Sequence, residues 1–208
     1  MMMSAPMRKL LLTTHVLSSI GWFGALLVFG AHSIASLVSV DPNIVRSVCI
    51  AMALTAWFVI LPLSLASLVT GVVEALGTAW GLLRHYWVVA KLLLTAFATA
   101  ILLLKLAPIS DLAAAAGKAS FSSSSLIDLK QSLLVHSAGG LIVLLLICVL
   151  AIYKPAGLTP FASKGEPREL PRWVRVSLVV AASITIVLAL LVMHGGHGPS
   201  MHSLHGPS

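Results

Sequence analysis

Residues 10–33 read LLLTTHVLSSIGWFGALLVFGAHS, an apolar run that contains no Asp, Glu, Lys or Arg. A helix rises about 1.5 Å per residue, so a helix of this run is long enough to cross a hydrocarbon core about 30 Å thick. Four later segments of the chain are also long and predominantly apolar. The sequence therefore predicts five transmembrane helices, which are Leu10–Ser33, Ser47–Val73, Tyr86–Leu104, Ser132–Tyr153 and Val176–Met193.

Composition supports a fold that has lipid as its solvent. Of the 208 residues 59% are hydrophobic and 9% are charged, a balance that excludes an ordinary soluble domain. The runs are continuously apolar and do not alternate polar with apolar residues, which excludes a β-barrel. We predict an all-α, polytopic membrane helix bundle with a four-helix core and a fifth C-terminal span. It forms one membrane-embedded domain over residues 1–194, followed by a flexible His-rich tail over 195–208.

The net charge of +7 is spread over the ends of the predicted helices and forms no basic run of the kind that binds nucleic acid. We therefore interpret the charges as signals for topology. With a cytoplasmic N-terminus, nine basic residues fall on the inner side and four on the outer side, which favours N-in and C-out in the inner (plasma) membrane. The inner set is Arg8, Lys9, Arg84, Lys91, Lys154, Lys164, Arg168, Arg172 and Arg175, and the outer set is Arg46, Lys105, Lys118 and Lys130.

Ionisable groups gather at the cytoplasmic ends of the first three predicted helices. His15 and Lys91 each lie about five residues inside their helices, at a shared depth of about 7 Å. Lipid makes such groups costly, so we expect both to face one interior cavity. A second interpretation is that Lys91 extends to the interface, Glu74 pairs with a neighbouring cation and His15 is hydrogen-bonded within the packing. The candidate cofactor-binding residues are His15, Lys91, Arg84, Trp22 and Glu74.

Histidines also mark the opposite side of the predicted membrane. His32 ends the first span, His136 opens the fourth, and His194 ends the fifth just before the tail, which repeats His-Gly-Pro-Ser. Imidazole and thioether groups suit copper or zinc, so these three histidines are candidate metal ligands. The alternatives are a disordered polar tail and a packed His136, whose neighbours Gly139 and Gly140 leave room for a flat ligand or a close helix.

Several short motifs resemble those of an uncharacterised bacterial multispanning membrane family of unknown function. The His-x6-Trp pattern of the first span, with the lysine near the start of the third, is remotely similar to compact membrane protoporphyrinogen oxidases that bind haem b. It is also similar to the membrane domain of copper-resistance proteins. The haem-binding resemblance implies that His15 is an axial ligand or porphyrin-site group and that Lys91 is its functional partner. The motifs are THV at 14–16, GWFG at 21–24, TG at 70–71, GTAWGLLRHYW at 77–87, HSAGG at 136–140 and YKPAGLT at 153–159.

Three functions are compatible with these features. The first is a haem-b-binding redox protein in which Lys91 or Arg84 meets a propionate and the porphyrin lies edge-on in the bundle. The second is a protein that handles or transports copper or another divalent metal through the outer histidines. The third is a non-catalytic accessory membrane subunit. The expected partners are the lipid bilayer and either a membrane redox partner or further copies of the chain, and nucleic acid is excluded.

Overall fold

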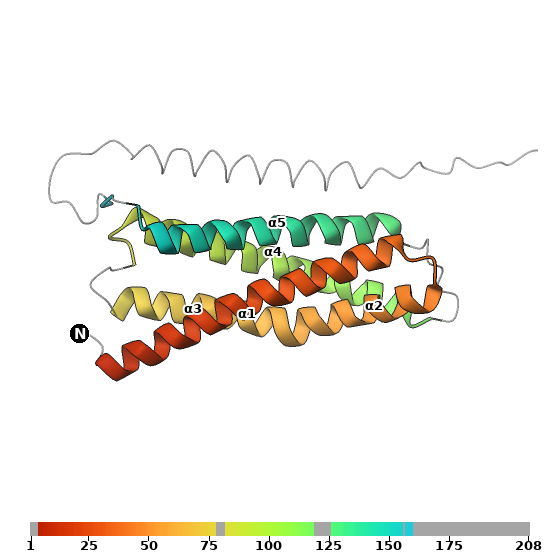
Figure 1. Ribbon diagram of the computed structural model, residues 1–208, viewed down its shortest axis with the longest axis horizontal. Coiled ribbons are helices and arrows are strands. Elements are labelled where there is room, and N and C mark those ends of the chain that lie inside the picture. The colour runs from red at the N-terminus through yellow and green to blue at the C-terminus, as the bar shows by residue number, and fades with distance from the viewer. Residues whose placement is uncertain (1–3, 78–81, 119–125, 156, 160–208) are drawn as a thin grey trace, which may run out of the picture.

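The computed structural model describes residues 4–77, 82–118, 126–155 and 157–159, and these form an antiparallel bundle of long helices (Figure 1). The elements are α1 (Ala5–Val38), α2 (Pro42–Thr55), the π-helical segment η1 (Ala56–Ile60), α3 (Leu61–Gly77), α4 (Tyr86–Ala116) and α5 (Ile127–Tyr153). Since α2, η1 and α3 follow one another without a break, they form one rod. Apart from an isolated β-bridge, the described residues are helical wherever they are regular, which confirms the predicted all-α class.

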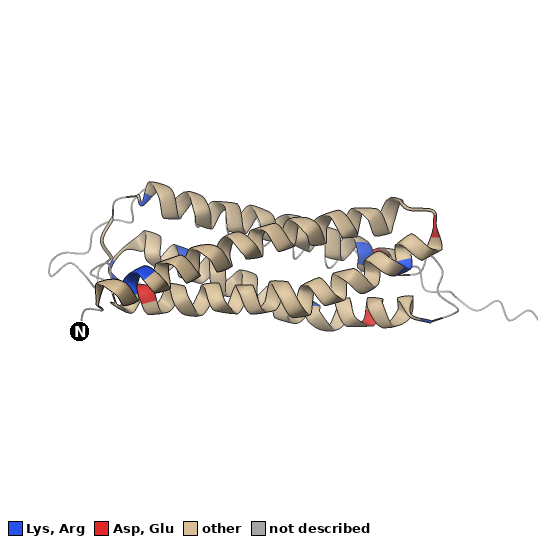
Figure 2. Ribbon diagram, turned by 60° about the horizontal axis from the view of Figure 1, so that its bottom comes forward, with Lys and Arg blue, Asp and Glu red and all other residues tan. Residues whose placement is uncertain are grey.

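Four helices are long and apolar enough to cross a membrane, namely Ala5–Val38, Pro42–Gly77, Tyr86–Ala116 and Ile127–Tyr153. In each, only 22–28% of the most apolar window is buried inside the bundle, so most of its apolar surface faces outward. Lys, Arg, Asp and Glu lie toward the two ends of the bundle and leave the middle free of them (Figure 2). This arrangement suits a lipid environment. The predicted fifth span, Val176–Met193, lies outside the described residues.

The core runs along the bundle and includes side chains from α1, α2, η1, α4 and α5. Proline begins α2 at Pro42, where Asp41 caps the helix by accepting a hydrogen bond from the Asn43 amide at 2.8 Å. The main buried apolar side chains are Trp22, Phe29, Val45, Cys49, Met52, Ala56, Ile60, Leu106, Ile109, Leu112, Ala116, Leu133 and Leu144.

Pro62 lies just after the π-helical segment η1 and disturbs the backbone hydrogen bonding of the rod there. Proline has no N–H, so the carbonyl one turn before it loses its usual partner. The chain accommodates this with a wider turn in which the Leu61 amide donates to the carbonyl of Ala56, five residues back. Ile60, the last residue of η1, is buried in the bundle.

The end of α4 differs from the prediction. The predicted third span ends at Leu104 and the fourth begins at Ser132, yet α4 continues through Pro108 to Ala116 and α5 already begins at Ile127. The reason is a stripe at helical spacing, Leu106, Ile109, Leu112 and Ala116, which is buried against α2. This burial outweighs the single backbone hydrogen bond that Pro108 removes.

Helix contacts near the bundle axis depend on small residues. A Cβ placed on Gly140 of α5 would lie 2.9 Å from Leu26 Cδ2 of α1, and one on Gly21 of α1 would lie 3.1 Å from Leu63 Cδ1 of α3. At Gly140 and at Gly21 the neighbouring helices therefore approach each other closely. Gly24 has open space beside it.

The two loop motifs at the N-terminal end of the bundle pair with each other. His85 and Leu158 form an antiparallel bridge, and the Thr159 amide donates to the Arg84 carbonyl at 3.0 Å. The Thr159 hydroxyl also donates to the Leu83 carbonyl. This pairing joins the start of α4 to the chain that follows α5.

Candidate functional site

His15 of α1 is held by α3 through its Nδ1 atom. Nδ1 lies 3.0 Å from the Ser67 carbonyl oxygen and 3.1 Å from Thr70 Oγ1. Because a carbonyl oxygen can only accept, Nδ1 carries a proton and donates it. In the neutral ring the lone pair then belongs to Nε2, for which the described residues provide no partner. This is the state in which histidines ligate metals, with the other ring nitrogen fixed by a carbonyl.

The sequence of α3 is adapted to this ring. A Cβ on Gly71 would lie 3.0 Å from His15 Cε1 and 3.4 Å from Nδ1. Any residue larger than glycine at position 71 would therefore force the imidazole to shift. One turn away, Ser19 and Ser67 hydroxyls lie 2.8 Å apart. Glycine and serine thus let α1 and α3 approach closely and provide polar partners within the bundle. The Thr70-Gly71 motif is explained by these contacts with His15.

Lys91 of α4 lies in the same half of the bundle and interacts electrostatically with His15 and Glu74. Its Nζ lies 5.0 Å from the centre of the Trp87 ring, at a distance suited to a cation–π contact. Glu74 Oε1 is buried without a hydrogen-bond partner in the described part of the chain. Lys154 lies close enough to repel Lys91, so cations outnumber the carboxylate here.

The other two candidates of this group lie apart from the polar cluster. Arg84 has an exposed side chain in the connector before α4, at the same end of the bundle. Trp22 is 3% exposed and lies two turns beyond His15 along α1, where it faces a cavity that His15 does not line. The structure therefore brings His15, Lys91 and Glu74 together and assigns Trp22 to different surroundings.

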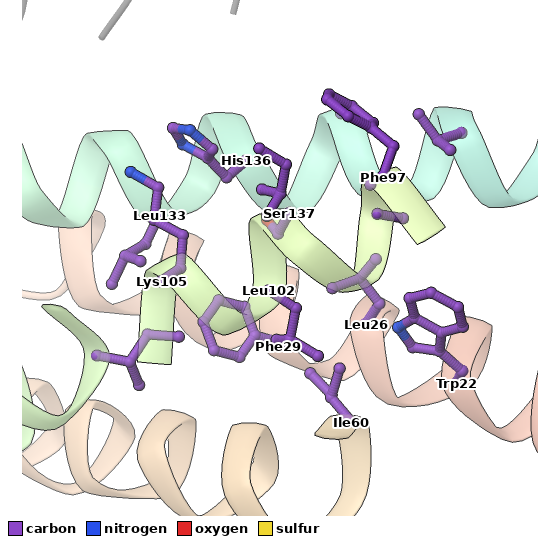
Figure 3. A pocket seen from close by; sticks show the side chains of 16 residues that line it. Trp22, Leu26, Phe29, Ile60, Phe97, Leu102, Lys105, Leu133, His136 and Ser137 are labelled. Carbon is purple, nitrogen blue, oxygen red and sulfur yellow. The ribbon is translucent and has the colours of Figure 1, made fainter. Parts of the chain in front are cut away.

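The cavity lies between α1, η1, α4 and α5 and has a volume of about 70 Å³ (Figure 3). Trp22, Phe29 and Phe97 form part of its apolar wall, and Ile60 of the π-helical segment closes one side. Lys105 and His136 are the ionisable groups in its lining. His136 Nδ1 lies 2.6 Å from the carbonyl of Ser132 one turn earlier, so Nδ1 donates and Nε2 again keeps its lone pair.

Two lysines at this end of the bundle were predicted only as topology signals. Lys105 lines the cavity and donates to Ser132 Oγ at 3.4 Å. Lys130, one turn into α5, is 1% exposed and acts electrostatically on Cys49. The sequence signal for Lys130 is its spacing from Leu133 and Ser137, which places all three on the buried face of α5.

The candidate metal ligands are described in part. His136 faces the cavity, and His32 Nδ1 is buried without a hydrogen-bond partner among the described residues. His194 lies outside those residues, so the approach of the three histidines stays a prediction. In the part of the chain that the structure describes, no three or more His, Cys, Asp or Glu side chains are grouped as a metal site requires.

Comparisons with protein families, with curated proteins and with solved structures gave no match for this chain.

Proposed function

We propose that this multi-pass membrane protein is a haem-b-binding redox protein in which His15 is an axial ligand of the iron. The observation that carries the proposal is the hydrogen bond from His15 Nδ1 to the Ser67 carbonyl, which leaves Nε2 as the basic nitrogen. His15 has partners for one ring nitrogen among the described residues and leaves the other available.

The surroundings fit an iron porphyrin in their chemistry. Thr70 fixes the orientation of the His15 imidazole, and Gly71 leaves the space that this imidazole occupies. Residues that hydrogen-bond to metal-bound histidines orient them in the same way. Lys91, with Lys154 nearby, supplies the positive charge that a propionate needs. Haem b, when bound, supplies one-electron chemistry, and its electrons would come from a membrane redox partner.

The orientation in the membrane belongs to the same proposal. With nine basic residues inside and four outside, the N-terminus is cytoplasmic, and His15 and Lys91 lie in the cytoplasmic half of the inner membrane. Any electron partner that acts at this site therefore approaches from the cytoplasmic side or within the bilayer.

Purification of the full chain in mild detergent, after expression with ample haem supply, tests the proposal. We expect a Soret band and about one haem per chain by pyridine haemochrome assay. His15→Ala should lose or shift the band while the protein still inserts into the membrane. His136→Ala is the matched control, because it removes a histidine with the same backbone-bonded Nδ1 from the other half of the bundle. A colourless wild-type protein, or loss of the band only in His136→Ala, refutes the assignment of His15.

The second candidate function is copper or divalent-metal handling through His32, His136 and His194. The specific observation in its favour is that His136 Nε2 and the buried His32 Nδ1 both lack partners in the described residues. Metal analysis of the same preparation tests it. Bound copper or zinc that is lost in His136→Ala supports this function. A preparation that contains neither haem nor metal leaves a non-catalytic accessory subunit as the remaining function.

A further inference from the structure

The cavity between α1, η1, α4 and α5 extends along α4. Along α4 its lining extends from Phe97 to Ile109, which corresponds to about 18 Å of helix. Its volume is about 70 Å³, well below the roughly 300–1,000 Å³ typical of pockets that enclose bulky ligands. A volume of this size excludes a broad ring system and encloses only part of an alkyl chain, so the rest of such a chain would lie along the apolar outer surface of the bundle.

The polar atoms of the cavity lie toward one end. Lys105 Nζ donates one hydrogen bond, to Ser132 Oγ at 3.4 Å, and has two further N–H groups. His136 projects beside it, and Figure 3 shows both side chains at the same end of the cavity, away from Trp22 and Phe97. The lining contains no Asp or Glu. The ammonium group of Lys105 therefore gives this end of the cavity a positive charge, and no carboxylate in the lining neutralises it.

The level of Lys105 matches that of lipid head groups. It lies nineteen residues after Tyr86, the first residue of α4, which corresponds to about 29 Å of helix, close to the thickness of a hydrocarbon core of about 30 Å. If Tyr86 marks one boundary of that core, Lys105 lies near the other. The apolar part of the cavity then extends from the interface toward the middle of the bilayer, as a lipid tail does.

We propose that this cavity binds a single-chain amphiphile that carries a carboxyl group, of the fatty-acid class. The carboxylate accepts hydrogen bonds from Lys105, and the alkyl chain lies along Leu133 and Phe29 toward Trp22. The proposal is independent of haem at His15, because the cavity lining does not include His15.

Fluorescence quenching on the full-length protein in detergent tests this site. The probe is 9,10-dibromostearic acid, whose bromine atoms quench an indole that they contact, and Trp22 lines the cavity. We expect saturable quenching that Trp22→Phe largely removes. The methyl ester of the same acid, which has no charge, should bind roughly tenfold more weakly because it forms no ion pair.

Variants identify the lysine that holds the carboxylate. Lys105→Met should weaken binding of the acid by about the same tenfold factor and leave binding of the ester unchanged. Lys118→Met is the matched control, since Lys118 has an exposed side chain just beyond the same end of α4. Equal binding of acid and ester by the wild-type protein, unchanged quenching in Trp22→Phe, or displacement of the acid by added haem overturns the proposal. The wild-type comparison holds even if Lys105→Met fails to fold.

Discussion

Replacing Gly71 with alanine should disturb His15 without removing any of its partners. The new Cβ would lie 3.0 Å from His15 Cε1, whereas carbon atoms prefer a separation of about 3.5–4.0 Å, so the ring must move by a few tenths of an ångström. Both partners of Nδ1, Ser67 and Thr70, lie on the same helix as Gly71. A ring pushed away from α3 therefore lengthens both hydrogen bonds beyond the usual limit of about 3.2 Å.

Loss of these supporting contacts should lower haem affinity by about 10–100-fold, the effect typical of changes to the partners of a metal-bound histidine. Haem titration of the apoprotein, followed at the Soret band, measures it. Gly24→Ala is the control, because nothing lies within 4 Å of the corresponding Cβ. Both changes favour helix by about 1 kcal/mol, so neither variant should unfold. Equal haem affinity in Gly71→Ala and Gly24→Ala would show that the His15 ring does not position a ligand.

Three further predictions concern topology, charge and packing. A periplasm-active reporter fused after Ser208 should be active and a cytoplasm-active one silent; the reverse pattern contradicts the N-in arrangement. Lys91→Met should leave the amount of membrane-inserted protein unchanged and weaken haem retention by roughly tenfold, while the exposed Lys9→Met has no effect; equal retention in a haem-washout assay argues against a role for this cation. Gly140→Leu should destabilise the bundle by about 1–3 kcal/mol in detergent-denaturation measurements, since a Cβ there already lies 2.9 Å from Leu26. Adding Leu26→Ala should recover part of the loss, and no recovery would place the strain elsewhere.

Helix positions could be predicted where hydropathy alone determines them. The apolar runs predicted four helices of the described bundle because lipid leaves the backbone no alternative. The helix α4 extends beyond the predicted span, which ends at Leu104, just before Lys105, Pro108 and Asp111. A membrane boundary and a helix end are different features. Burial of Leu112 against α2 extends the helix beyond the apolar run, and only a stripe at helical spacing indicates it.

The candidate site was partly predictable for a similar reason. Depth along a helix follows from residue count, so the shared level of His15 and Lys91 could be predicted from the sequence. Which neighbouring helix a side chain faces depends, in contrast, on how the helices cross. The hydrogen bond from His15 to Ser67 and the cavity beside Lys105 arise from such crossings. Trp22 illustrates the limit, since it shares a face with His15 on α1 and still lines a separate cavity.

Chemical rescue at position 15 tests whether His15 ligates the haem iron. In His15→Gly the axial ligand would be missing and the neighbouring space enlarged, so free imidazole can take the place of the side chain. The His15→Gly protein purified with haem supply should lack the wild-type Soret band, and added imidazole should restore it. A band that is already present without imidazole, or one that imidazole does not restore while the bundle remains folded, would contradict His15 as the ligand of the iron.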